Sequence, residues 1–240
     1  MIFDLAEKVV LIAGGTGGLG RAVSLAFLAE GAKVVVTYRK AEEFDALKSL
    51  AGAGAEALEG AQVDVTDEKS VSMLVDETLT KGSGRLDVVV NTVGGYAGGL
   101  KLWETDADVF NRMLNLNLRS GFALAHATMP VMLRQGRGAF VNVAAKAAVD
   151  HAAGASAYAA SKAAAVAMFD SLAADAKGTG VRVNTILPSI IDTEVNRTAM
   201  PGAPFDQWPK PEEIATVILF LASDQARVIH GASIPVYGNN

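Results

Sequence analysis

The stretch that most constrains the fold lies near the start of the chain, where an apolar run leads directly into a row of glycines. Residues 8–13 read KVVLIA, residues 14–20 read GGTGGLG, and helical spacing of apolar side chains follows from Arg21 to Glu30. An apolar run rich in β-branched residues is typical of a central parallel strand. A tight turn can need glycine for purely structural reasons. The strand before this turn and the helix after it favour a site for a nucleotide pyrophosphate.

The same alternation of strand and helix continues to the end of the chain. Further strands are expected at 33–37, 62–66, 86–91, 139–144, 181–187 and 232–236. Helices are expected at 41–50, 67–79, 106–126, 158–177 and 212–223. Strands that are apolar on both faces and joined by helices predict an α/β fold, a doubly wound (Rossmann) parallel sheet of about seven strands. We expect one domain over residues 1–240, with ligands at the carboxyl ends of the strands.

Composition argues against several classes of function. The chain has 21 Lys and Arg against 26 Asp and Glu, a net charge of −5, which disfavours nucleic acid and anionic membranes as partners. It has no cysteine, so disulfides, thiolate catalysis and Cys-based zinc sites are excluded, and we expect no metal site. No apolar stretch reaches the ~20 residues of a membrane span, and no signal peptide is visible. We expect a soluble, cytoplasmic protein that acts on a small molecule.

The tip of the second strand bears on the choice of cofactor. In dinucleotide folds an acidic residue at this tip accepts the ribose 2′-OH of NAD, whereas an Arg accommodates the 2′-phosphate of NADP. Here the tip reads Tyr38-Arg39-Lys40, with two cations and no carboxylate. This pattern favours NADP(H), with NAD(H) as the alternative. The other interpretation is a solvated loop with ordinary charges.

Tyr158 and Lys162 form the candidate reactive pair. They are four residues apart, which in a helix puts both side chains on one face. A phenol has an unperturbed pKa near ~10, and a nearby ammonium group favours the phenolate and lowers that pKa. Such a pair can give a proton to a carbonyl or take one from an alcohol. Alone, this spacing would equally suit an alanine-rich helix that carries a Tyr and a Lys.

Together these motifs resemble those of the short-chain dehydrogenase/reductase family, in its compact single-domain form, over almost the whole chain. The family's glycine motif falls on Ala13 to Gly20, its NNAG segment on Asn91 to Gly94, and its PGxxxT segment on residues 188–193. The resemblance implies that Asp64 hydrogen-bonds the adenine, with Val65 beside it. The cofactor-binding residues it implies are Gly14, Thr16, Gly18, Leu19, Gly20, Arg39, Asp64, Val65, Asn91, Gly94, Tyr158, Lys162, Pro188 and Thr193.

The resemblance also implies catalytic roles and an assembly. Tyr158 would exchange the proton, Lys162 would lower its pKa and bind the nicotinamide ribose, and Asn117 would support a water leading to the lysine. Members of the family pair their mid-chain and tyrosine-bearing helices with those of a neighbour, which implies a homodimer or homotetramer. The alanine-rich helix after Tyr158 permits such packing but could equally pack on its own sheet.

The chain departs from the family pattern at three positions. The opening Thr of the glycine motif is Ala13. The basic residue that NADP-binding members often have before the second motif glycine is Gly17, which leaves Arg39, with help from Thr16 and with Lys40 as a further candidate, to carry the preference for the 2′-phosphate. The third departure is Ala145, which lies thirteen residues before Tyr158, where the family has its catalytic serine. Ser156 is close in sequence, but the usual geometry gives no reason to expect it in the pocket. We do not expect Lys146 or His151 to be catalytic either.

Two functions from different classes remain. The first is an NADPH-dependent reductase of a small carbonyl, quinonoid or imine-type substrate. An acceptor that is already reactive depends less on the hydrogen bond that the missing serine would donate. The second is a catalytically weak or inactive NADP(H)-binding regulatory module, which Ala145 favours and the intact Tyr158, Lys162 and Asn117 disfavour. A small substrate loop is expected at about 194–210. Its aromatic side chains, like Tyr96 and Trp103, either contact the substrate or pack against the body of the protein.

Overall fold

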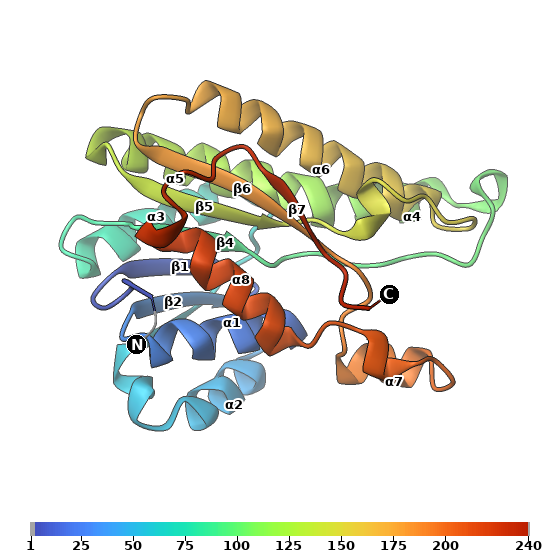
Figure 1. Ribbon diagram of the computed structural model, residues 1–240, viewed down its shortest axis with the longest axis horizontal. Helices are drawn as coiled ribbons and strands as arrows, with labels where there is room; N and C mark the ends of the chain where they lie inside the picture. Colours follow the sequence, from blue (N-terminus) through green and yellow to red (C-terminus); the bar gives the residue numbers. More distant parts are fainter. Residues whose placement is uncertain (1–2, 240) are drawn as a thin grey trace.

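The fold is one seven-stranded parallel sheet with helices on both faces (Figure 1). The computed structural model describes residues 3–239. In the sheet the strands lie in the order β3-β2-β1-β4-β5-β6-β7. From β1 the chain adds β2 and β3 toward one edge of the sheet. It then crosses back to place β4 on the other side of β1, and β5, β6 and β7 follow toward the opposite edge. The strands are β1 (Val9–Ala13), β2 (Lys33–Tyr38), β3 (Leu58–Gln62), β4 (Val88–Asn91), β5 (Gly138–Val143), β6 (Val181–Pro188) and β7 (Ser233–Val236).

Two hydrophobic layers hold the helices to the sheet. In β1, Val10 and Ile12 pack in one layer while Leu11 and Ala13 pack in the other, because successive side chains of a strand point to opposite faces. The first layer lies under α1 (Gly18–Ala29) and α8 (Pro211–Ala222), with α2 (Ala41–Ala51) beside them. The second lies under α3 (Glu68–Lys81), α5 (Ser120–Gln135) and α6 (Ser156–Asp175). The strand and helix pattern of the sequence therefore predicted the layers correctly.

The third strand is not where the sequence suggested. It is Leu58–Gln62 rather than 62–66, and it pairs with β2 from Val34↔Leu58 to Tyr38↔Gln62. Because β3 is an edge strand, only Leu58 in it is buried, so it lacks the apolar run of the inner strands. The alternation of Val63 and Val65 belongs instead to the loop that follows β3.

The middle of the chain is an interrupted helix. α4 (Ala107–Leu114) leads into a π-helical turn at Asn115–Arg119, and α5 continues from Ser120. The expected single or paired helix at 106–126 is thus two helices joined by a π turn. Such turns in α-helices are frequent at functional sites.

The expected substrate loop at 194–210 is partly helical. Its first residues form α7 (Glu194–Ala199), whose N-cap Thr193 accepts a hydrogen bond from the backbone of Asn196 at 3.3 Å. A 3₁₀ turn at Phe205–Gln207 follows, and Trp208 beyond it is buried. A capped first turn is enough to start a short helix within an expected loop.

Candidate functional site

The glycine turn between β1 and α1 is closely packed at three of the predicted positions. Gly14 has a φ of +75°, and a Cβ on Gly20 would lie 2.0 Å from the carbonyl oxygen of Gly14. A Cβ on Gly18 would lie 2.9 Å from the side chain of Thr193, so the turn meets the start of α7. The N-cap of α1, Gly17, provides no side-chain cap. The first backbone N–H groups of α1 are therefore left for a ligand, and they favour an anion.

A cavity of about 430 Å³ opens beside this turn, at the carboxyl ends of the first four strands. Its walls include many of the predicted cofactor residues, which come from separate loops. Those that line it are Gly14, Thr16, Arg39, Asp64, Val65 and Gly94. The residues predicted for the nicotinamide end, including Tyr158 and Thr193, lie outside this cavity.

Asp64 and Asn91 both support the walls of the cavity through local hydrogen bonds. Asp64 Oδ1 accepts from the backbone N–H and the hydroxyl of Thr66, at 2.9 and 2.8 Å. Asn91 is buried, and its Nδ2 donates to Asn142 Oδ1 at 3.0 Å across the β4–β5 pair. Its Oδ1 accepts from the backbone N–H of Val93 at 3.2 Å. Asn91 thus ties β5 to the turn after β4.

One carboxylate of the cavity wall was missed at the sequence level. Glu43, in the first turn of α2, lines the cavity with Thr16 and Arg39. Its Oε2 accepts from Thr16 Oγ1 at 3.1 Å, and its Oε1 lies 3.8 Å from Lys40 Nζ. The sequence analysis considered a carboxylate only at the tip of β2. Glu43 follows Arg39 by four residues, and this spacing could have indicated that its carboxylate lies beside Arg39.

Asn117, Lys162 and Gly94 come together from three different segments. Asn117, in the π turn, accepts from the backbone N–H of Gly95 at 2.9 Å. It also donates to the carbonyl oxygen of Gly95 at 3.0 Å and to Ser161 Oγ at 2.9 Å. A Cβ on Gly94 would lie 2.9 Å from Asn117 Oδ1 and 3.1 Å from Lys162 Nζ. Only glycine therefore allows this close approach.

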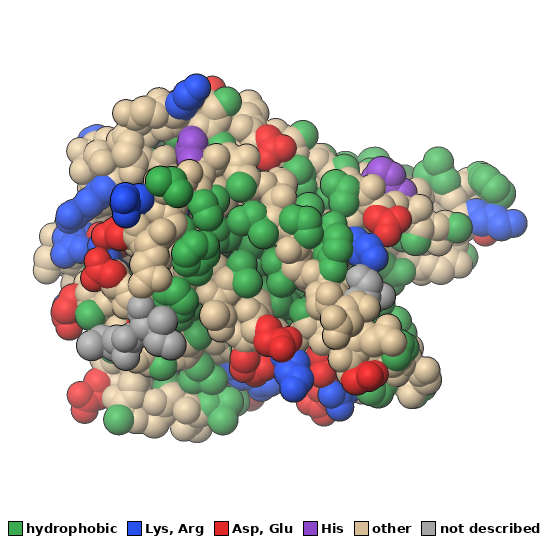
Figure 2. Space-filling view, viewed as in Figure 1, with side chains coloured by type: hydrophobic (Ala, Val, Ile, Leu, Met, Phe, Trp, Pro, Cys, Tyr) green, Lys and Arg blue, Asp and Glu red, His purple; other side chains and the backbone are tan. Residues whose placement is uncertain are grey.

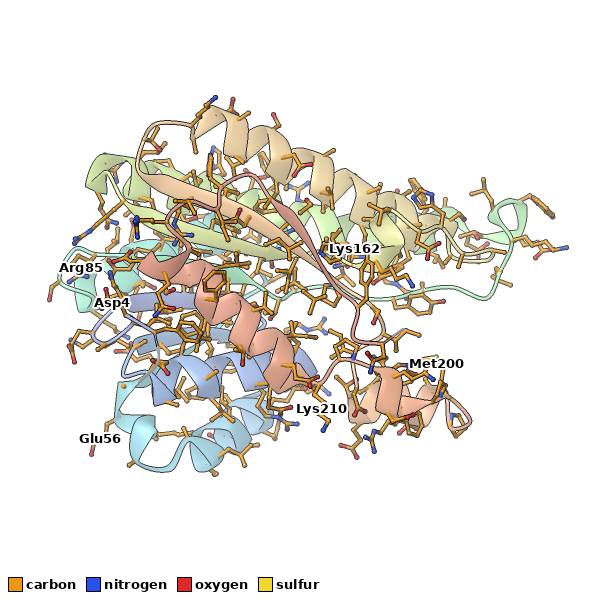
Figure 3. The ribbon with its side chains drawn as sticks, in the orientation of Figure 1. Asp4, Glu56, Arg85, Lys162, Met200 and Lys210 are labelled. Atoms are coloured by element: carbon orange, nitrogen blue, oxygen red, sulfur yellow. The ribbon has the colours of Figure 1, made fainter. Side chains whose placement is uncertain are left out.

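Lys162 is buried and its charge faces a backbone carbonyl. Its Nζ donates to the carbonyl oxygen of Val143, the last residue of β5, at 3.1 Å. Figure 3 shows Lys162 on the side of α6 that faces the sheet. Burial lowers the pKa of Lys162 to about 8, because a desolvated ammonium group is disfavoured.

The pKa of Tyr158 moves opposite to the sequence expectation. Burial, and then the neighbouring phenol of Tyr96, raise it to about 12. The rings of Tyr96 and Tyr158 meet edge to face with centroids 5.0 Å apart. Lys162, which was expected to lower this pKa, is not among the causes of the shift, and its Nζ is directed to Val143.

The position expected for a serine lies in an apolar and well-packed place. Ala145 is 7 % exposed and stands just before a 3₁₀ turn at Lys146–Ala148. Lys146 lies 3.6 Å from Asp150 and over the ring of Tyr237. Ser156 Oγ is buried and has no hydrogen-bond partner within residues 3–239. Ala145 itself has no hydroxyl, so the donor expected at this position is absent.

The aromatic residues expected around the substrate divide into two groups. Tyr96 contacts Tyr158, whereas Trp103 is 79 % exposed and has Lys101 over its ring. Phe205 and Trp208 pack against each other with ring centroids 5.0 Å apart. Trp208 therefore serves to pack its own segment, whereas Tyr96 contacts a member of the reactive pair.

Neither a metal centre nor a membrane-spanning helix is found among the residues that the structure describes. Within residues 3–239, no group of three or more His, Asp or Glu side chains could hold a metal ion. No helix in the same range is long and apolar enough to cross a membrane.

A parallel sheet with a glycine turn and a cavity at its switch point is the arrangement of the doubly wound dinucleotide-binding folds. Residues 13–238 match the family model described as enoyl-(acyl carrier protein) reductase. The chain is 33% identical to the 3-oxoacyl-(acyl-carrier-protein) reductase FabG of Thermotoga maritima, over 98% of each chain. It is 35% identical to the D-threitol dehydrogenase of Mycolicibacterium smegmatis, over 98% of this chain and 94% of that one.

Solved structures agree with the sequence relatives. The structure titled "ElxO with NADP Bound" superposes with a TM-score of 0.91 at 28% identity, covering 97% of this chain and 98% of that one. A short-chain dehydrogenase/reductase from Burkholderia xenovorans superposes with a TM-score of 0.89 at 33% identity, covering 98% of this chain and 97% of that one. The chain belongs to the short-chain dehydrogenase/reductase family of NAD(P)-dependent oxidoreductases.

Proposed function

We propose that the protein is an NADPH-favouring reductase of a small carbonyl, quinonoid or imine-type substrate, with Tyr158 as its proton donor. The observation that carries the proposal is the convergence of Asn117, Gly94 and Lys162 at the carboxyl ends of the strands. Asn117 comes from the π turn, and Lys162 and Tyr158 come from α6. They and the Tyr96–Tyr158 contact lie next to the cavity that Gly94 lines.

The residues present fit a dinucleotide. The cavity wall contains backbone where a Cβ would clash, and α1 begins without a side-chain cap. Gly14, Thr16, Asp64 and Val65 would hold the adenosine half, and Arg39 would attract a 2′-phosphate. Pro188 ends β6 and Thr193 lies beside Gly18 of the glycine turn, and both would hold the nicotinamide end. When bound, the nicotinamide supplies the hydride.

Tyr158 holds its proton in the folded chain, because burial raises its pKa to about 12. A phenol with so high a pKa is a weak acid, so the proposed role needs this pKa to be lowered when Lys162 approaches. Lys162 would hold ribose hydroxyls and approach the phenol once its Nζ is drawn from Val143. Asn117 would fix the Gly95 backbone and Ser161 beside them.

Ala145 supports an unusual substrate. A side chain with no hydroxyl cannot donate to the substrate oxygen, and the loss of one such donor commonly costs about 10²–10³ in rate. A quinonoid ring, an imine or an activated ketone builds less charge on oxygen and depends less on that donor. The segment 194–210, with α7 and Met200, is proposed to cover the substrate.

NADP(H) is the favoured cofactor, with NAD(H) as the alternative. Arg39 lines the cavity, and the similar solved structure carries NADP in its title. Both observations support a 2′-phosphate near the tip of β2.

We also propose a homodimer or homotetramer. Leu114, Leu118, Phe122 and Met168 line a surface hollow of about 540 Å³ along α4, α5 and α6. Hydrophobic side chains also gather over β7 and α8, where charged side chains are sparse (Figure 2). Two separate apolar faces support pairing through one of them and a larger assembly through both.

A test of the reductase compares NADPH consumption by the wild type, Tyr158→Phe and Ala145→Ser, on ketones and on quinonoid or imine acceptors. We expect turnover of the activated acceptors, a loss of about 10²–10⁴ in Tyr158→Phe with NADPH binding kept, and new ketone reduction in Ala145→Ser. Full activity of Tyr158→Phe would refute its role as proton donor.

The same assay tests the second candidate function, a regulatory module that binds NADP(H) without turnover. Ala145 favours the module, because it removes a donor and leaves the binding residues in place. If the wild type binds NADPH, consumes none with any acceptor, and Ala145→Ser restores ketone reduction, the module is the better conclusion.

A further inference from the structure

A carboxylate stands in the wall of the candidate nucleotide cavity, beside the residues predicted to bind the 2′-phosphate. Glu43 lines the cavity together with Thr16 and Arg39. We propose that Glu43 sets the cofactor preference of this protein, because it competes with the 2′-phosphate for the hydroxyl of Thr16 and the charge of Lys40. The inference rests on the proposed function, since it needs a dinucleotide in this cavity.

The two oxygens of Glu43 already engage two of the groups that a phosphate would use. Thr16 Oγ1 donates its proton to Oε2 at 3.1 Å, and Lys40 Nζ lies 3.8 Å from Oε1. A hydroxyl has one proton to donate, so Thr16 cannot serve Glu43 and a phosphate together. Before either residue can bind a phosphate, it must leave Glu43.

Arg39 differs from Lys40 in this respect. Within residues 3–239, no ion pair holds its guanidinium, and only its backbone carbonyl is engaged, by Gln62 Nε2 at 2.8 Å. Arg39 is therefore ready to bind a phosphate at this tip without losing a partner. The Arg39 guanidinium would attract the 2′-phosphate, whereas the Glu43 carboxylate on the same wall would repel it.

The two cofactors should respond differently to this carboxylate. NADP(H) brings a dianionic phosphate next to Glu43, whereas NAD(H) brings a neutral ribose hydroxyl that can donate to it. Glu43 is partly exposed, so solvent screens the repulsion. Screened repulsion at this range corresponds to about three- to tenfold in a binding constant. Glu43 thus reduces the ratio by which NADPH binds more tightly than NADH, so that NADH can also bind.

The test uses the full chain and two variants of equal charge. Glu43→Gln removes the charge but keeps the size and an oxygen that can accept from Thr16. Glu42→Gln removes the same charge from the neighbouring position, which is exposed and does not line the cavity. Dissociation constants are measured by fluorescence titration for NADPH and NADH, and by calorimetry for 2′,5′-ADP and 5′-AMP.

We expect Glu43→Gln to bind NADPH and 2′,5′-ADP about three- to tenfold more tightly, with NADH and 5′-AMP changed less than about twofold. High salt should reduce the difference, and Glu42→Gln should behave like the wild type. Equal changes in both variants, or an unchanged NADPH-to-NADH ratio in Glu43→Gln, would overturn the inference while leaving the proposed function intact. Failure of the wild type to bind any of the four nucleotides would overturn both.

Discussion

At the scale of single residues, the candidate site depends on polar groups that have no access to bulk water. Asn117 and Lys162 are 3 % and 5 % exposed, and each satisfies backbone groups of a neighbouring segment. A buried polar side chain of this kind is costly to remove, because its partners then lose their hydrogen bonds. The same contacts that would serve catalysis therefore also contribute to the stability of the fold.

Replacing Asn117 by Ala leaves the backbone N–H and carbonyl of Gly95, and Ser161 Oγ, without their partner. We expect a loss of about 2–4 kcal/mol in the free energy of unfolding, measured by urea denaturation. Ser72→Ala, at an exposed position of α3, serves as control and should change it by less than about 0.5 kcal/mol. Equal stability of the two variants would show that the Asn117 bonds contribute nothing.

Lys162 predicts a pH dependence of stability. Its pKa is lowered from 10.5 to about 8 in the folded chain, so between these values the unfolded chain binds more protons. Stability should therefore rise as the pH increases from 8 to 10.5, by up to about 3 kcal/mol, and be constant below this window. The measurement is urea denaturation across this range for the wild type and Lys162→Met. The variant should lack the rise, and a parallel pH profile would contradict the burial of the charge.

Tyr158 predicts the opposite slope at higher pH. Its pKa is raised from 10.0 to about 12, so the unfolded chain loses this proton first. The stability from the buried phenol is complete below pH 10 and is lost as the pH rises toward 12. In Tyr158→Phe this loss should be absent, which comparison of denaturation at pH 10 and 11.5 would test. The same fall in both proteins would place the titration elsewhere.

At the scale of elements, the site is made by loops that adjoin the carboxyl ends of strands. Gly94 follows β4, Val143 ends β5, and the π turn brings Asn117 between them. Each contact depends on the length of a short connection. An added side-chain atom at one of these positions therefore changes the distances within the site.

Gly94→Ala tests this close packing. Its Cβ would lie 2.9 Å from Asn117 Oδ1 and 3.1 Å from Lys162 Nζ, closer than ordinary contact. We expect a stability loss of about 1–3 kcal/mol and weaker nucleotide binding. Gly202→Ala is the control, because no atom lies within 4 Å of its added Cβ. A Gly94→Ala protein as stable and as active as Gly202→Ala would show that the neighbours can move aside at little cost.

The elements also show what the sequence could predict. The inner strands, such as β1 and β4, were found because burial on both faces leaves continuous apolar runs. β3 was misplaced because an edge strand with Glu59 and Gln62 on its faces carries no such run. The residues gathered at the cavity were predicted by motif, but the place of Glu43 depends on how α2 turns back on the glycine turn. The raised pKa of Tyr158 comes first from burial and then from Tyr96, sixty-two residues away in the sequence, and no local pattern reveals either.

At the scale of the whole molecule, the proposed assembly gives a measurable prediction. Phe122 is 44 % exposed and lines the hollow beside α5, where a partner would cover it. We expect Phe122→Glu to shift the molecular mass from an oligomer to a smaller species in light scattering after size-exclusion chromatography, because a charge would be buried. Leu50→Glu introduces the same charge at a 59 % exposed position of α2, outside both proposed faces, and should leave the mass unchanged. A wild type that is already monomeric would refute the assembly.

The π turn at Asn115–Arg119 makes the chain sensitive to the number of residues at this one place. A π turn closes i→i+5 hydrogen bonds, so it holds one residue more than an α turn of the same advance. Deleting one residue here would let α4 run into α5 as a regular α-helix, with both helices keeping their places on the sheet. Asn117 would no longer stand in the wider turn, and its hydrogen bonds to Gly95 would be lost. The extra residue thus serves the site rather than the packing of the two helices, and a segment grafted from a relative must keep it.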